Sequence, residues 1–142
     1  MAPGKITKSD GSAFSILIVD DSMFQRKVIT NIAIEMGFNN IKEAPDGSDA
    51  IEFYKKERPD IITLDITMPG KNGYDTLKDI MQFDSSAVAV MVSALTHDKI
   101  IKQCLEAGAA GYITKPFKAP QVSYQIGRIL RKYYDARYPE EE

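Results

Sequence analysis

Residues 16–21 read ILIVDD, a short run of branched apolar residues that ends on two carboxylates. The same design recurs downstream as IITLD over 61–65, VAVMVS over 88–93 and GYITKP over 111–116. Short runs rich in Val and Ile and bounded by polar or turn residues are typical of buried β-strands. The segments between these runs have helical periodicity. The sequence therefore predicts alternating strands and helices, which form a parallel sheet with helices on both faces.

A fifth apolar run, over 41–44, differs from the others because it ends on Ala44-Pro45 and carries no reactive group. In a doubly wound α/β sheet, ligands bind beyond the carboxyl ends of the strands, where the strand order reverses. A strand at the outer edge of such a sheet lies away from that point. We therefore interpret the chain as one doubly wound domain with five parallel strands, in which the second strand lies at the edge.

The helices between these strands have recognisable ends. Ser22 is a residue type that caps a helix at its first turn, and Gly37 follows the last apolar position of the same pattern. Pro120 can open the last helix at its first position.

Bulk properties favour a globular protein with one core. The chain has 142 residues, of which 44% are hydrophobic and 27% are charged, and its net charge is −2. These values give no reason to expect binding to nucleic acid or to a membrane, and no apolar stretch approaches the roughly 20 residues that cross a bilayer. Cys104 is the only cysteine, so we expect a reducing, cytoplasmic environment without disulfides. We expect a loose tail over 1–13, a single domain over 14–138 and an acidic tail over 139–142.

Five reactive side chains follow four of the predicted strands: Asp20 and Asp21, Asp65, Ser93, and Lys115. Carboxylates that are crowded together repel one another, and a bound cation with a fixed ammonium group relieves that repulsion. Carboxylate ligands suit Mg²⁺ better than metals that prefer thiolate or imidazole. A carboxylate beside Mg²⁺ can attack phosphorus, while the ammonium and hydroxyl groups hold the phosphoryl oxygens. The joint placement predicts a phosphoryl-accepting site.

Four segments carry a family resemblance: ILIVDDS over 16–22, TLDITMP over 63–69, VSA over 92–94 and GYITKPF over 111–117. They closely resemble the receiver domain of two-component response regulators, and within that family the stand-alone, CheY-like chemotaxis regulators. The resemblance covers nearly the whole chain. It implies a flavodoxin-like fold with five helices and the strand order 2-1-3-4-5.

The resemblance also implies roles for the reactive residues. Asp65 would be the phosphoacceptor. Asp21 would bind Mg²⁺ directly, Asp20 largely through water, and Asp65 and the main-chain carbonyl of Thr67 would complete the protein ligands. Lys115 would contact the phosphoryl group, and its bond to Pro116 would be cis, as proline allows.

Further roles concern the switch and the partner surface. Ser93 would move towards the phosphoryl group and Tyr112 would swing inward. A new charge-assisted hydrogen bond that biases a two-state loop is a reasonable physical basis for such a switch. Ile101, Tyr112 and Gln125 would contact a partner on the face formed by the fourth helix, the fifth strand and the fifth helix.

The resemblance implies that the chain is a monomeric signalling switch. It would not be an enzyme with a substrate of its own, and would catalyse only its own phosphorylation and dephosphorylation. A histidine kinase would donate the phosphoryl group. The output would be binding to the flagellar motor switch protein or to another target that recognises the phosphorylated form. An alternative is a phosphorelay intermediate that passes phosphate to a histidine phosphotransfer protein.

A remoter alternative is a hydrolase that forms an aspartyl-phosphate. Such enzymes usually carry a second Asp two residues after the nucleophile, where this chain has Thr67. In receivers, that position and the one occupied here by Leu95 influence the attacking water. Neither side chain offers a carboxylate or an amide, so we predict a phosphoryl lifetime of minutes and the need for an external phosphatase.

Overall fold

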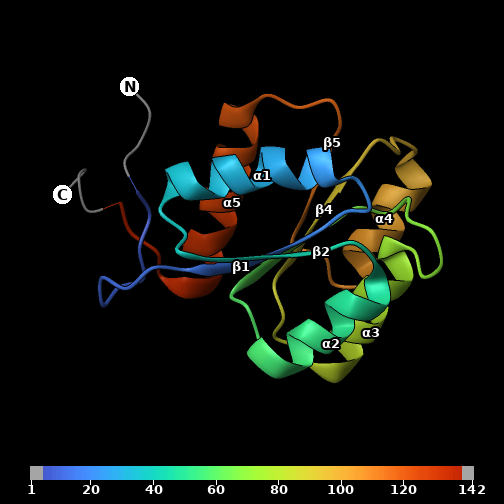
Figure 1. Cartoon of the computed structure of the whole chain (residues 1–142), viewed down its shortest axis with the longest axis horizontal. Helices are drawn as coiled ribbons and strands as arrows, with labels where there is room; N and C mark the ends of the chain where they lie inside the picture. The colour runs from blue at the N-terminus through green and yellow to red at the C-terminus, as the bar shows by residue number, and fades with distance from the viewer. Residues whose placement is uncertain (1–4, 139–142) are drawn as a thin grey trace.

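Five parallel strands form one sheet in the order β2-β1-β3-β4-β5, as predicted (Figure 1). The computed structural model describes residues 5–138. Strands and helices alternate along the chain: β1 (Ser15–Val19), α1 (Met23–Met36), β2 (Asn40–Ala44), α2 (Gly47–Glu57), β3 (Ile61–Leu64), α3 (Gly73–Phe83), β4 (Ala89–Ser93), α4 (Asp98–Glu106), β5 (Gly111–Thr114) and α5 (Ala119–Tyr134).

Helices cover both faces of the sheet, α1 and α5 on one side and α2, α3 and α4 on the other (Figure 1). Alternate residues of a strand point to opposite faces. Ile16 and Ile18 of β1 accordingly pack in the core cluster with α1 and α5, whereas Leu17 and Val19 pack in the cluster on the other face. Within residues 5–138, no helix combines the length and the apolar character that a membrane span requires.

The ends of α1 are those that the sequence predicts. The Ser22 hydroxyl accepts a hydrogen bond from the Gln25 amide at 3.2 Å, and Gly37 ends the helix with φ of 101°, a left-handed conformation that glycine adopts without strain. The prediction for Pro120 is wrong by one residue. Helix α5 begins at Ala119, so Pro120 occupies the second position, where the amide also has no intrahelical acceptor.

The expectation of a loose tail over 1–13 is wrong for residues 5–8. Ile6 is only 1% exposed, and its amide donates to the Met36 carbonyl at 2.8 Å. Thr7 and Arg137 form an antiparallel bridge through two hydrogen bonds of 2.8 Å. Burial of the Ile6 side chain, an apolar residue in a polar stretch, favours this ordered position, because Ile6 packs in the core cluster with residues of α1 and α5. Residues 1–4 and the acidic tail over 139–142 lie outside the described residues.

We call this paired segment, residues 5–8 with 136–138, the terminal clasp. Its carboxyl side is held by Tyr138, which is 8% exposed. The hydroxyl of Tyr138 lies so close to Gly127 of α5 that a Cβ there would come within 2.3 Å of it. Lys8 adds an ion pair of 3.2 Å with Asp60, at the start of β3. The clasp therefore joins both ends of the described chain to the edge of the sheet at which the strands begin.

Replacement of Ile6 by Ala tests whether the clasp belongs to the folded core. Loss of a buried isoleucine side chain is expected to lower the free energy of unfolding by about 3 kcal/mol, measured by urea denaturation followed by circular dichroism. Ser9→Ala, at an exposed position of the same segment, is the matched control and should be neutral. An Ile6→Ala protein as stable as the control would show that residues 5–8 do not contribute to the core.

Candidate functional site

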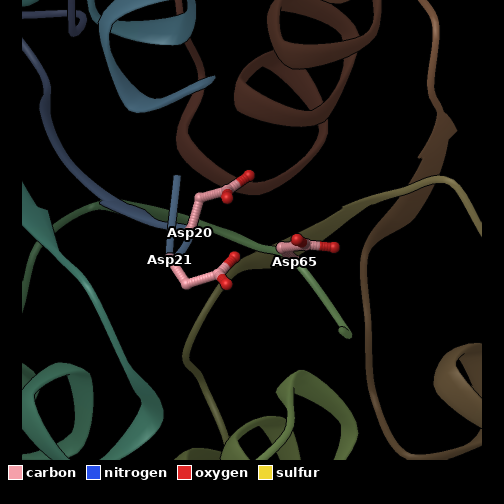
Figure 2. Close-up of side chains that lie close together, drawn as sticks. All are labelled: Asp20, Asp21 and Asp65. Carbon is pink, nitrogen blue, oxygen red and sulfur yellow. The ribbon is translucent and has the colours of Figure 1, made fainter. Parts of the chain in front are cut away.

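Three carboxylates meet at the edge of the sheet where β1 and β3 end (Figure 2). Asp20, Asp21 and Asp65 each offer an oxygen, and these oxygens lie within 4.8 Å of one another. Asp20 and Asp65 are buried, 2% and 8% exposed, whereas Asp21 is exposed. The structure thus brings together the three predicted carboxylates.

Backbone hydrogen bonds place this cluster by extending the sheet past the ends of its strands. The Asp65 amide donates to the Val19 carbonyl at 3.0 Å, and the Asp20 amide donates to the Ala44 carbonyl at 3.2 Å. Asp20 and Asp65 therefore directly follow buried strands, and hydrogen bonds that continue the sheet hold their main chains in place.

Lys115 enters the cluster from the end of β5. Its Nζ lies 2.7 Å from Oδ2 of Asp20 and 3.5 Å from Oδ2 of Asp65. One ammonium group therefore contacts both buried carboxylates, and its contact with a phosphoryl group stays a prediction. The peptide bond between Lys115 and Pro116 is cis, also as predicted.

Burial raises the pKa of Asp65 above its usual value, and the neighbouring Asp20 carboxylate raises it further. The Lys115 ammonium and the Thr67 amide, 3.4 Å from Oδ1, oppose that rise. Because the pKa of Asp65 is raised overall, the Lys115 ammonium only partly offsets the cost of burying the Asp65 carboxylate. A further cation at the cluster would complete the compensation.

The donor set fits a hard divalent cation. The cluster offers carboxylate oxygens and no sulfur or imidazole ligand among the described residues, a set that Mg²⁺ prefers. Exposed Asp21 leaves the cluster open to solvent on one side, so that water could supply the remaining ligands of a bound cation. Thr67 lies two residues after Asp65. That its main-chain carbonyl binds the cation stays a prediction.

Ser93 and Tyr112 are joined through one residue, Leu95. The fully buried Ser93 hydroxyl accepts a hydrogen bond from the Leu95 amide at 3.2 Å. The Tyr112 hydroxyl donates to the Leu95 carbonyl at 2.6 Å, and burial raises its pKa. The half-buried ring of Tyr112 is thus tied to the loop after β4, instead of having its hydroxyl in water.

The three residues predicted to contact a partner lie on three elements. Ile101 is on α4, Tyr112 on β5 and Gln125 on α5, and each is half-buried. Exposed apolar side chains also occur on these helices, with Leu105 47% and Tyr124 65% exposed. The partner role of this surface stays a prediction.

Sequence reasoning missed two residues that shape the site. A Cβ on Gly73 would lie 2.0 Å from the Asp65 carbonyl oxygen, so only glycine allows α3 to begin this close to the residue that follows β3. The position of Gly73 in the turn-rich segment after Pro69 was a usable signal. Arg26 of α1 donates to the Asp20 carbonyl at 2.7 Å, and no motif points to it.

Comparison with known proteins places this geometry in a family. The profile of the response regulator receiver domain matches residues 16–126, a range that contains the three carboxylates, Ser93, Tyr112 and Lys115. The chain belongs to the response regulator receiver family.

Similar receivers include chemotaxis proteins from distant bacteria. The chain is 42% identical to chemotaxis protein CheY of Bacillus subtilis over 118 residues, which are 83% of this chain and 98% of that protein. It is 38% identical to CheY of Thermotoga maritima over 116 residues, 82% of this chain and 97% of that one. A crystal structure of the CheX-CheY-BeF3-Mg²⁺ complex from Borrelia burgdorferi contains a chain 41% identical to this receiver, with a TM-score of 0.83 over 85% of this chain and 92% of that one.

Asp65→Asn tests the charge crowding that the geometry implies. In Mg²⁺-free buffer at neutral pH, the substitution is expected to raise the free energy of unfolding by on the order of 1 kcal/mol, because it removes a buried charge. The raised pKa of Asp65 gives the sign of the pH dependence. Wild type loses stability as the pH rises through that pKa, so the gap between the two proteins closes as the pH falls.

The measurement is urea denaturation between pH 4 and 8 in the presence of a chelator, followed by circular dichroism because the chain has no tryptophan. Glu52→Gln removes an exposed carboxylate from the middle of α2 and is the control for net charge. If Asp65→Asn is less stable than wild type at neutral pH, the crowding argument is wrong.

Proposed function

We propose that this receiver is a signalling switch in which Asp65 accepts a phosphoryl group and the phosphorylated form binds another protein. The observation that carries the proposal is the setting of Asp65: a buried carboxylate with the Lys115 ammonium at 3.5 Å and two further carboxylates beside it. This is the arrangement that a phosphoryl acceptor requires, because the reaction needs positioning and charge neutralisation.

The chemistry follows from these groups. With a phosphohistidine as donor, an oxygen of the Asp65 carboxylate forms a bond to phosphorus while the bond from phosphorus to nitrogen breaks. The imidazole leaves with that electron pair and takes up a proton, and Asp65 becomes an acyl phosphate. Lys115 can turn from the carboxylates to a phosphoryl oxygen, and Ser93 can donate its hydroxyl to another.

Mg²⁺ is the proposed cofactor, held by Asp21, Asp65 and the Thr67 carbonyl, with Asp20 acting through water. Its contribution when bound is to neutralise charge on the phosphoryl oxygens. The donor chemistry of the cluster supports this assignment. So does the presence of Mg²⁺ in the Borrelia burgdorferi complex with a similar chain.

We place the switch in chemotaxis, with a histidine kinase as phosphodonor and the flagellar motor switch protein as the target of the phosphorylated form. Support comes from the similar proteins of Bacillus subtilis and Thermotoga maritima, 42% and 38% identical to this chain, which are both named chemotaxis protein CheY. The complex of a similar chain with CheX supports a second kind of protein partner.

Phosphorylation can be tested by intact mass spectrometry after incubation with acetyl phosphate and Mg²⁺. Wild type is expected to gain one phosphoryl group, because Asp65 lies beside exposed Asp21, and Lys115 together with Mg²⁺ would neutralise the charge at the cluster. Asp65→Asn should gain none, and Asp21→Asn or a chelator should strongly reduce the gain. The proposal is overturned if Asp65→Asn is labelled like wild type.

The half-life of the acyl phosphate tests the prediction of a phosphoryl lifetime of minutes. Thr67 is exposed and Leu95 presents an apolar side chain, so neither orients a water molecule for attack. A half-life of minutes is expected in the isolated protein with Mg²⁺, followed by mass spectrometry after removal of the donor. Thr67→Asn, which adds a carboxamide, should shorten it several-fold, whereas Thr67→Val should not. A wild-type half-life of seconds would contradict the prediction.

A further inference from the structure

Arg26 contacts the main chain of the acidic cluster at the carbonyl of Asp20. This residue is the fourth of α1, and its side chain is 14% exposed. Its guanidinium donates from one terminal nitrogen to the Asp20 carbonyl at 2.7 Å and from Nε to Glu43 of β2 at 3.0 Å. One planar group thus connects the first turn of α1, the edge strand and the loop that carries two of the carboxylates.

We propose that Arg26 is a positioning residue, which fixes the loop of Asp20 and Asp21 in the orientation that binds the divalent cation. The inference rests on the proposed function, since it concerns the cation site of that mechanism. Arg26 does not touch the carboxylate oxygens in any contact described, so its action passes through the backbone.

The hydrogen bonds of Asp20 show why the carbonyl contact matters. Its amide is bonded to Ala44, and its two carboxylate oxygens accept from the Ser22 amide at 2.9 Å and from Lys115. The carbonyl is the remaining polar atom, and Arg26 holds it. Because the peptide unit is planar, fixing this carbonyl also fixes the plane that carries the Asp21 amide. The direction in which Asp21 leaves the loop is set in this way.

Apart from these contacts, the position of Arg26 near the start of α1 is electrostatically unfavourable. A positive side chain near the amino end of a helix opposes the helix dipole, and α1 has no acidic residue in its first turn. Glu43 supplies a counter-charge, but its side chain is 39% exposed, and exposed ion pairs contribute little. The favourable interaction that Arg26 makes at this position is therefore its hydrogen bond to the carbonyl of buried Asp20.

The test measures Mg²⁺ affinity by isothermal titration calorimetry in four variants. Arg26→Gln is expected to weaken binding about tenfold, the size typical of groups that orient metal ligands. Arg26→Lys keeps a donor and the charge, so its loss should be smaller. Glu43→Gln removes the ion pair and keeps the carbonyl contact, so its affinity should stay near that of wild type. Lys27→Gln removes the same charge from an exposed neighbour on α1 and should have no effect.

A second measurement needs no metal. Amide hydrogen exchange of Asp20 and Ser22, followed by NMR in a chelator, should speed up in Arg26→Gln while the exchange of β4 amides does not change. Such a local change separates loss of loop order from general destabilisation, which would affect both regions.

The outcomes separate this inference from the proposed function. If wild type binds Mg²⁺ and Arg26→Gln binds it equally well, the inference is overturned and the proposed function stands. If Glu43→Gln weakens binding as much as Arg26→Gln, the ion pair and not the carbonyl contact is responsible, which also overturns it. If wild type binds no Mg²⁺, the proposed cofactor is wrong, and the claim that Arg26 orders the loop is decided by exchange alone.

Discussion

The charge on Asp65 is the constraint around which this receiver is arranged. A carboxylate that is 8% exposed and close to a second buried carboxylate is costly in free energy. Lys115 offsets part of that cost through contacts with both groups. Because the compensation is incomplete, the site favours additional positive charge. The stable core on both faces of the sheet keeps this strained cluster in place.

The same edge of the sheet leads to the surface where a partner is proposed to bind. Ser93 contacts the Leu95 amide, and the carbonyl of the same residue accepts from Tyr112. A phosphoryl group that accepts the hydroxyl hydrogen of Ser93 would draw its Oγ away from the Leu95 amide, from which it now accepts, and so alter the loop that also holds the tyrosine hydroxyl. Two hydrogen bonds therefore link Ser93, beside the proposed phosphorylation site, to the hydroxyl of an aromatic side chain on β5.

The fold and most of the acidic cluster could be predicted from the sequence because both depend on local pattern. Short Val- and Ile-rich runs fix the strands, and the parallel arrangement then brings residues 20, 21, 65 and 115 to one edge. What could not be predicted depends on single long-range contacts. Ile6 is one apolar residue in a polar segment, Gly73 is needed only because α3 begins against Asp65, and Arg26 acts on a carbonyl that carries no sequence signal.

The terminal clasp has a consequence for the use of this protein as a building block. Thr7 and Arg137 lie side by side, and Thr7 precedes the start of β1, whereas Asp20 and Asp65 directly follow the ends of β1 and β3. The first and last described segments are thus adjacent, at the opposite edge of the sheet from the acidic cluster, and this arrangement suits circular permutation and domain insertion. A short linker across the clasp could close the chain into a ring, and new ends could then be opened in an exposed loop without disturbing the acidic cluster.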